Sequence, residues 1–208
     1  MPWLEEEIRS AKAKVGGFAD GELMIGMHIR HGDSCLKTKK SGKICHGIEE
    51  YMRAANEMQQ LYQVSHIYLA TDNPDIAQML SKHAYKWRNF TWHMLELDDG
   101  VQGRLETSSL GLGAKRLDSK DCPKNSSGCV DMTGAASLSI IEVSLLASTD
   151  FFIGTFSSNM GRTAYEMMSV EKGYRPYVTL DFAWCGHWGI SKPVYLAYNP
   201  KKKLRRKC

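Results

Sequence analysis

The sequence predicts an α/β protein with a Rossmann-like parallel sheet, and three observations support this class. Short apolar runs that suit strands alternate along the chain with stretches of helical periodicity. The run Leu23–Arg30 is apolar almost throughout, as expected of a strand buried on both faces. Polar residues directly follow the expected strands, at the edge where open α/β sheets bind ligands.

The first half of the chain is expected to supply three of the strands. A charged helix over Glu5–Val15 is ended by the glycine pair Gly16-Gly17. The strand Leu23–Arg30 ends in a turn at His31–Asp33. A helix is expected over Ile48–Tyr62, and a second strand over His66–Ala70. A turn at Thr71–Pro74, a helix over Asp75–Ala84 and a strand over Phe90–Leu95 are expected to follow.

The second half begins with a polar, Gly-rich stretch, Asp98–Thr133, which is expected to be a long loop. An apolar helix over Leu138–Ala147 precedes a buried strand, Phe151–Ile153, which Gly154 ends. Apolar residues then recur at helical spacing, at Met160, Ala164, Met167 and Met168. Pro176–Leu180 is expected to be the last strand.

Length and composition indicate one globular domain. The 208 residues are 43% apolar and 24% charged, and we expect a domain over residues 1–200 with a basic tail at 201–208. The tail holds six of the 27 basic residues, and removing them leaves 21 basic against 23 acidic residues, so no basic surface for nucleic acid is indicated. The alternatives for the tail are anionic lipid headgroups, a partner, or solvent alone.

The chain lacks several patterns that mark cofactor sites. It contains neither Gly-x-Gly-x-x-Gly nor Gly-x-x-x-x-Gly-Lys-Ser/Thr, which argues against a dinucleotide dehydrogenase and a P-loop enzyme. No Cys-x-x-Cys pair suggests zinc, and the spacing of Asp98, Asp99 and Asp121 is not that of a calcium loop. A divalent ion bound by these three aspartates is the remaining alternative.

Cysteine spacing favours an oxidising compartment. Cys35 and Cys45 bracket one polar segment, and Cys122 and Cys129 bracket another, which suits small disulfide-closed loops. Two glycosylation sequons agree with this, at Asn89-Phe-Thr91 and Asn125-Ser-Ser127. We expect a secretory lumen, and because the sequence shows no signal peptide or membrane span, an N-terminal part beyond this chain is expected to carry an anchor.

Charged side chains gather after the first two strands. His28, Arg30 and Asp33 cluster at the carboxyl end of the first strand, where an arginine can neutralise a phosphate or form an ion pair with Asp33. For His28 the alternative is a buried histidine satisfied by the backbone. Asp72 follows the second strand, where its carboxylate orders the site or forms an Asx turn with Pro74 that caps the next helix.

Three hydroxyls lie between the strand Phe151–Ile153 and the following helix. Thr155, Ser157 and Ser158 form a tight turn, and a serine before a helix caps it. The free amides of the first helical turn, together with the helix dipole, make an anion site at the carboxyl end of a strand. A helix cap without a ligand is the structural alternative.

Three stretches resemble the motifs of the α1,6- and protein O-fucosyltransferase superfamily, and most closely its α1,6-fucosyltransferase-like branch. They are His28-Ile-Arg-His-Gly-Asp33, Ile67-Tyr-Leu-Ala-Thr-Asp-Asn-Pro74 and Gly154-Thr-Phe-Ser-Ser-Asn-Met-Gly-Arg-Thr-Ala-Tyr-Glu-Met-Met168. The family's fold has two Rossmann-like halves, of the GT-B type. The resemblance implies that this chain matches the donor-binding C-terminal half.

The resemblance also implies site residues. Arg30 falls on the arginine that binds the donor's diphosphate, and Glu142 falls on the acid that pairs with guanine, although an ordinary solvent-facing helix residue is the alternative for Glu142. A carboxylate suits guanine because it accepts the adjacent N1–H and N2–H together. The remaining donor-binding candidates are His28, Asp72, Thr155, Phe156, Ser157 and Ser158.

Besides Glu142, where the family has an aspartate, four positions depart from the family's pattern. The family's second arginine is His31 here, its lysine is Ser34, and its second acid is Asn73. The family carboxylate that follows the first motif aligns near Thr38, which cannot act as a general base, so Asp33 is the substitute catalytic candidate beside Arg30.

The resemblance implies transfer of L-fucose from GDP-β-L-fucose to a glycan or protein hydroxyl, with inversion and without a metal or other cofactor. It further implies a Golgi or ER lumenal protein whose N-terminal anchor, the only contact with the membrane, is missing from this chain. A catalytically inactive GDP-sugar-binding or lectin-like module is the alternative. An unrelated phosphate-binding α/β enzyme, such as a sugar phosphatase, is a third interpretation.

Overall fold

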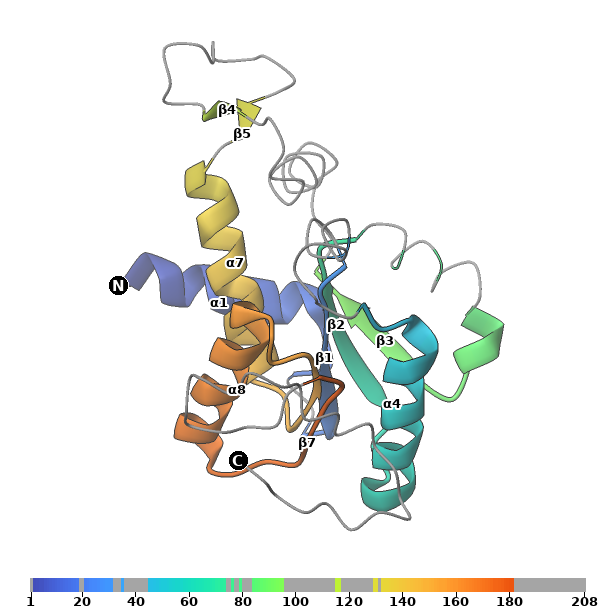
Figure 1. The fold of residues 1–208 in the computed structure, drawn as a ribbon. Coiled ribbons are helices and arrows are strands. Elements are labelled where there is room, and N and C mark those ends of the chain that lie inside the picture. The colour runs from blue at the N-terminus through green and yellow to red at the C-terminus, as the bar shows by residue number, and fades with distance from the viewer. Residues whose placement is uncertain are drawn as a thin grey trace.

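The computed structural model contains a five-stranded, all-parallel sheet in the order β3-β2-β1-β6-β7, with helices on both faces (Figure 1). The predicted α/β class with a Rossmann-like parallel sheet is therefore confirmed. The structure describes residues 2–18, 21–31, 35, 45–73, 76, 79, 84–95, 115–116, 129–130 and 132–181.

The sheet strands are β1 (Met24–Ile29), β2 (His66–Thr71), β3 (Thr91–Met94), β6 (Phe151–Gly154) and β7 (Tyr177–Thr179). The α-helices are α1 (Pro2–Val15), α4 (Ile48–Tyr62), α7 (Met132–Ala147) and α8 (Asn159–Lys172). A 3-10 helix, η1, spans Ala84–Trp87, and a separate short ladder pairs β4 (Lys115–Arg116) with β5 (Cys129–Val130).

The central strand β1 marks a change of direction in the sheet. It pairs with β2 on one side, and on the other side its Met27 lies opposite Ile153 of β6. The chain leaves β1 toward α4 on one face, whereas it leaves β6 toward α8 on the other face. The topological switch point, where such sheets bind ligands, therefore lies at the carboxyl ends of β1 and β6.

Side chains of β1 alternate between two apolar clusters. Ile25, Met27 and Ile29 pack with α4, whereas Met24 packs with α1, α7 and α8 on the opposite face. Every residue of β1 is buried, which explains the continuous apolar run in the sequence. Gly26 is required by close packing, because a Cβ there would lie 2.5 Å from the Thr149 hydroxyl.

The stretch Asp98–Thr133 differs from the long loop that we expected. Among its described residues, β4 and β5 form a two-residue parallel ladder, and α7 begins at Met132 instead of Leu138. The α7 helix includes Gly134, a poor helix former, because propensity is a weak prior that the apolar remainder of the helix overrides. The helix expected over Asp75–Ala84 includes Ile76 and Met79, whereas Ala84 belongs to η1.

The expected disulfide between Cys35 and Cys45 is present, with the two Cα atoms 5.7 Å apart. It ties the chain that follows β1 to the residues that precede α4. Cys122, the expected partner of Cys129, lies outside the described residues, as do the basic tail and everything after residue 181. None of the described helices is long and apolar enough to cross a membrane.

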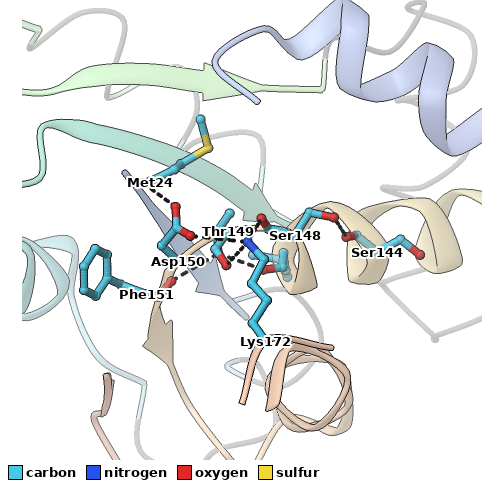
Figure 2. Close-up of polar contacts among 8 residues, drawn as sticks. Met24, Ser144, Ser148, Thr149, Asp150, Phe151 and Lys172 are labelled. Carbon is cyan, nitrogen blue, oxygen red and sulfur yellow. Dashed lines mark hydrogen bonds and ion pairs between the residues drawn. The ribbon is translucent and has the colours of Figure 1, made fainter. Parts of the chain in front are cut away.

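Lys172, in the last turn of α8, joins four elements at the amino end of the sheet (Figure 2). Its ammonium donates to the carbonyl oxygens of Ser148 and Thr149, just after α7, and lies 3.3 Å from the Asp150 carboxylate. That carboxylate also accepts a hydrogen bond from the Met24 amide at 3.1 Å. The group thus fixes the end of α7 against the starts of β1 and β6.

We expect Lys172→Met to lower the free energy of unfolding by about 1–2 kcal/mol, because charge-assisted hydrogen bonds to the carbonyls at a helix end are lost. Methionine keeps the apolar stem that packs in place. The urea midpoint should fall with an unchanged m-value. Lys14→Met, at an exposed residue in the last turn of α1, is the control. Equal midpoints for the two variants would contradict the prediction.

Candidate functional site

An ion pair joins the ends of β1 and β2. The Arg30 guanidinium lies 2.7 Å from one carboxylate oxygen of Asp72, and the other oxygen accepts a 2.8 Å hydrogen bond from the His31 amide. The Asp72 side chain is 14% exposed and that of Arg30 is 32% exposed. Asp72 is therefore a carboxylate partner of Arg30, whose side chain stays partly open to solvent. Asp33 lies outside the described residues.

The same ends are tied by further hydrogen bonds. The Thr71 hydroxyl donates to the Ile29 carbonyl at 2.9 Å, which holds the two strand ends in register. The His31 ring makes a 2.6 Å contact with the carbonyl of His46, and His46 in turn contacts Glu50 at 3.2 Å near the start of α4. His31, at the position of the family's second arginine, is thus engaged by the protein itself.

The turn between β6 and α8 is organised by a residue that the sequence did not reveal. The amides of Phe156 and Ser157 donate to the two carboxylate oxygens of Asp181, at 2.7 and 3.0 Å. Asp181 follows β7 and is buried. A search for the first acid after the last strand would have found it, but no motif singles it out.

The hydroxyls of this turn have separate environments. Ser158 is the N-cap residue of α8, as expected, but its side chain makes no capping hydrogen bond, so the prediction of a serine cap is wrong in this respect. Neither Ser157 nor Ser158 uses its hydroxyl in a bond to the described part of the chain. Thr155 is buried.

The side chain of Phe156 lies in the apolar core instead of facing a ligand. Its ring is 2% exposed, and its centroid lies 5.9 Å from that of Phe152 and 5.6 Å from that of Tyr165. Among the four residues of the turn, Phe156 therefore anchors the backbone and leaves ligand contacts to its neighbours.

Polar groups are buried on the face of the sheet that α7 and α8 cover. His28 is 2% exposed, and its Nδ1 hydrogen-bonds to none of the described residues. A Cβ on Gly161, in the first turn of α8, would lie 3.0 Å from this nitrogen. The hydroxyl of Tyr68, on neighbouring β2, is likewise buried without a described partner. The sequence analysis singled out His28 but overlooked Tyr68, because tyrosine is common in ordinary strands.

Electrostatics connect these groups to the ion pair. Burial lowers the pKa of His28 to about 4, with Asp72 opposing this shift and Arg30 adding to it. Burial and then the charge of Asp72 raise the pKa of Glu142 to about 7. Burial and then Glu142 raise the pKa of Tyr68 well above its usual value. His28, Arg30, Asp72 and Glu142, which lie on three different elements, therefore share one electrostatic environment.

The sheet register aligns the remaining candidates. Met27 of β1 lies opposite Ile153 of β6. Arg30 follows Met27 by three residues, and Phe156 follows Ile153 by three residues. The turn with Ser157 and Ser158 thus lies at the same edge of the sheet as Arg30, at the switch point. Among the described residues, no group of three or more His, Cys, Asp or Glu side chains could hold a metal ion.

No protein-family profile matches the chain. Two solved structures of NodZ alpha-1,6-fucosyltransferase are similar to it. The one soaked with GDP-fucose has 18% sequence identity and a TM-score of 0.41, and the match covers 80% of this chain and 42% of NodZ. The one co-crystallized with GDP has 16% identity and a TM-score of 0.40, over 79% and 41%. The chain spans about two fifths of the length of these NodZ structures.

Proposed function

We propose that this chain binds GDP-β-L-fucose and serves inverting transfer of L-fucose to a glycan or protein hydroxyl. The single observation that carries the proposal is the partly open Arg30 guanidinium, which Asp72 holds at the switch point beside the β6–α8 turn. A guanidinium has five N–H groups in a planar fork, a geometry that suits the oxygens of a diphosphate. The motif resemblance supplies the identity of the nucleotide.

In this proposal Arg30 stabilises the leaving group. Transfer passes through an oxocarbenium-like sugar that parts from the nucleotide diphosphate, and a positioned cation stabilises the charge that develops there. The hydroxyls of Ser157 and Ser158 and the first amides of α8 bind phosphate oxygens. No metal is required, so chelators should leave donor binding unchanged.

Glu142 and His28 are proposed to hold the guanine. An ionised Glu142 accepts the base's N1–H and N2–H, and since burial raises the pKa of Glu142 to about 7, guanine binding should release a proton near neutral pH. His28 is proposed to bond with the base in its neutral form, since burial lowers its pKa to about 4 and its Nδ1 has no hydrogen-bond partner among the described residues.

The wider context is also a proposal. The disulfide Cys35–Cys45 and the exposed sequon residue Asn89 support a Golgi or ER lumen. Asp33 is proposed as the general base, and a glycan or glycoprotein as the acceptor. A donor-binding module without catalysis is the second candidate, because the ring of His31 is tied to His46 and supplies no second guanidinium.

The test is calorimetric titration of the 208-residue chain with GDP, GDP-fucose and ADP, with and without EDTA. We expect GDP and GDP-fucose to bind at least tenfold more tightly than ADP, because adenine lacks the paired donors that Glu142 accepts. Fucose transfer to a glycan mixture would separate the enzyme from the binding module. Failure of GDP to bind would reject both candidates.

A further inference from the structure

Three donors from the described residues hydrogen-bond to the buried carboxylate of Asp181. One oxygen accepts the Phe156 amide at 2.7 Å and the Thr179 hydroxyl at 2.9 Å, and the other accepts the Ser157 amide at 3.0 Å. Asp181 is 9% exposed and Thr179 is 4% exposed. The end of β7 is thereby joined to the turn that precedes α8.

Two successive amides that point at one anion form a concavity of the kind that often binds phosphate. Here the protein's own carboxylate fills it. A ligand phosphate at this edge therefore meets the uncommitted hydroxyls of Ser157 and Ser158 and the amides of the first turn of α8. Because each oxygen of Asp181 takes a different amide, the two peptide planes are fixed relative to each other, and so are the backbone positions of the two serines.

We propose that Asp181 is a positioning residue for the donor's diphosphate, acting through the β6–α8 turn without touching the ligand. This inference rests on the proposed function. Loss of the carboxylate leaves buried amides unsatisfied, which is costly enough to make the turn seek other hydrogen-bond partners. The serines would then leave the positions at which phosphate oxygens reach them, whereas the guanine contacts on α7 and β1 would remain.

The experiment compares wild type with Asp181→Asn, for which one of the two acceptor oxygens becomes an NH2 group facing an amide. GDP and guanosine are titrated against each protein well below its melting temperature. We expect Asp181→Asn to weaken GDP binding about tenfold and to leave guanosine binding unchanged. Thr179→Val, which removes one donor but keeps both amide contacts, should weaken GDP binding only about two- to threefold.

Amide hydrogen exchange supplies a readout that needs no ligand. In Asp181→Asn the amides of Phe156 and Ser157 should exchange faster, while those of the β1 core stay protected. Tighter GDP binding by the variant would overturn the inference, because it would identify Asp181 as a competing anion. Equal losses for GDP and guanosine, or no loss for either, would overturn it as well. If wild type bound neither ligand, the proposed function would fail first, and the positioning role would fall with it.

Discussion

Arg30→Ala should weaken GDP binding about 100-fold. A hydrogen bond to a charged group contributes about 1.5–3 kcal/mol, and about 1.4 kcal/mol is a factor of ten in affinity. The substitution also removes the cation that neutralises Asp72, whose nearly buried carboxylate would then face the diphosphate. Both effects act in the same direction. Calorimetry on the 208-residue chain gives the measurement.

Arg88→Ala is the matched control, because it removes the same charge from an exposed residue that precedes β3, at the opposite end of the sheet. Its GDP affinity should equal that of wild type. Arg30→Lys keeps the charge but not the planar fork, so an intermediate affinity is expected. Comparable affinities for Arg30→Ala and Arg88→Ala would remove the observation on which the proposed function stands.

Glu142→Gln should stabilise the ligand-free protein above neutral pH by on the order of 2–3 kcal/mol. Burial and the charge of Asp72 raise the folded-state pKa of Glu142 from 4.5 to about 7, so between these values the folded state binds a proton that the unfolded state has released. Stability therefore falls as pH rises through this window, and above it the cost of a charged, half-buried carboxylate remains. Glutamine stays neutral throughout.

The contribution of His28 to stability changes with pH in the opposite direction. Burial lowers its folded-state pKa from 6.5 to about 4, so between these values the unfolded state binds the additional proton. The contribution of His28 to stability is therefore complete above pH 6.5 and is lost as pH falls toward 4. In the wild type the two residues offset each other between about pH 4.5 and 6.5.

Urea unfolding of wild type and Glu142→Gln at several pH values tests this. The difference in the free energy of unfolding should be close to zero near pH 4.5 and should grow until about pH 7. The variant alone should gain stability steadily from pH 4 to 6.5, because the His28 contribution is no longer offset. Glu166→Gln, an exposed site on α8, is the control. A constant difference across the range would refute the assignment.

Much of the fold could be read from the sequence because its signals are local. The apolar run of β1, the glycine pair after α1 and the helical spacing in α4 each act within one element. The observed bounds of these elements lie within one residue of the expected ones, except that α1 begins at Pro2 instead of Glu5. The start of α7 was misplaced because Gly134 and its small neighbours resemble a loop in isolation. Their helical state depends on the apolar remainder of that helix, which local propensity does not register.

The site was only partly accessible by the same reasoning. Arg30, Asp72 and the serine turn lie at strand ends, where the parallel-sheet rule directs attention. The pairing of Arg30 with Asp72 depends on which strands are neighbours, and the sequence pattern does not specify this. Asp181 was missed because its role comes from two amides that lie 24 and 25 residues earlier in the chain.

The sheet order also bears on synthesis at the ribosome. Ile25 of the central strand pairs with Phe151, which is translated 126 residues later. Strands β1, β2 and β3 can therefore associate early. The edge of β1 that later pairs with β6 keeps unpaired backbone groups and exposed apolar side chains until β6 emerges. During that interval the nascent chain exposes an incomplete, aggregation-prone sheet. Chaperones that shield exposed strand edges should therefore matter more for this protein than the stability of its folded state suggests.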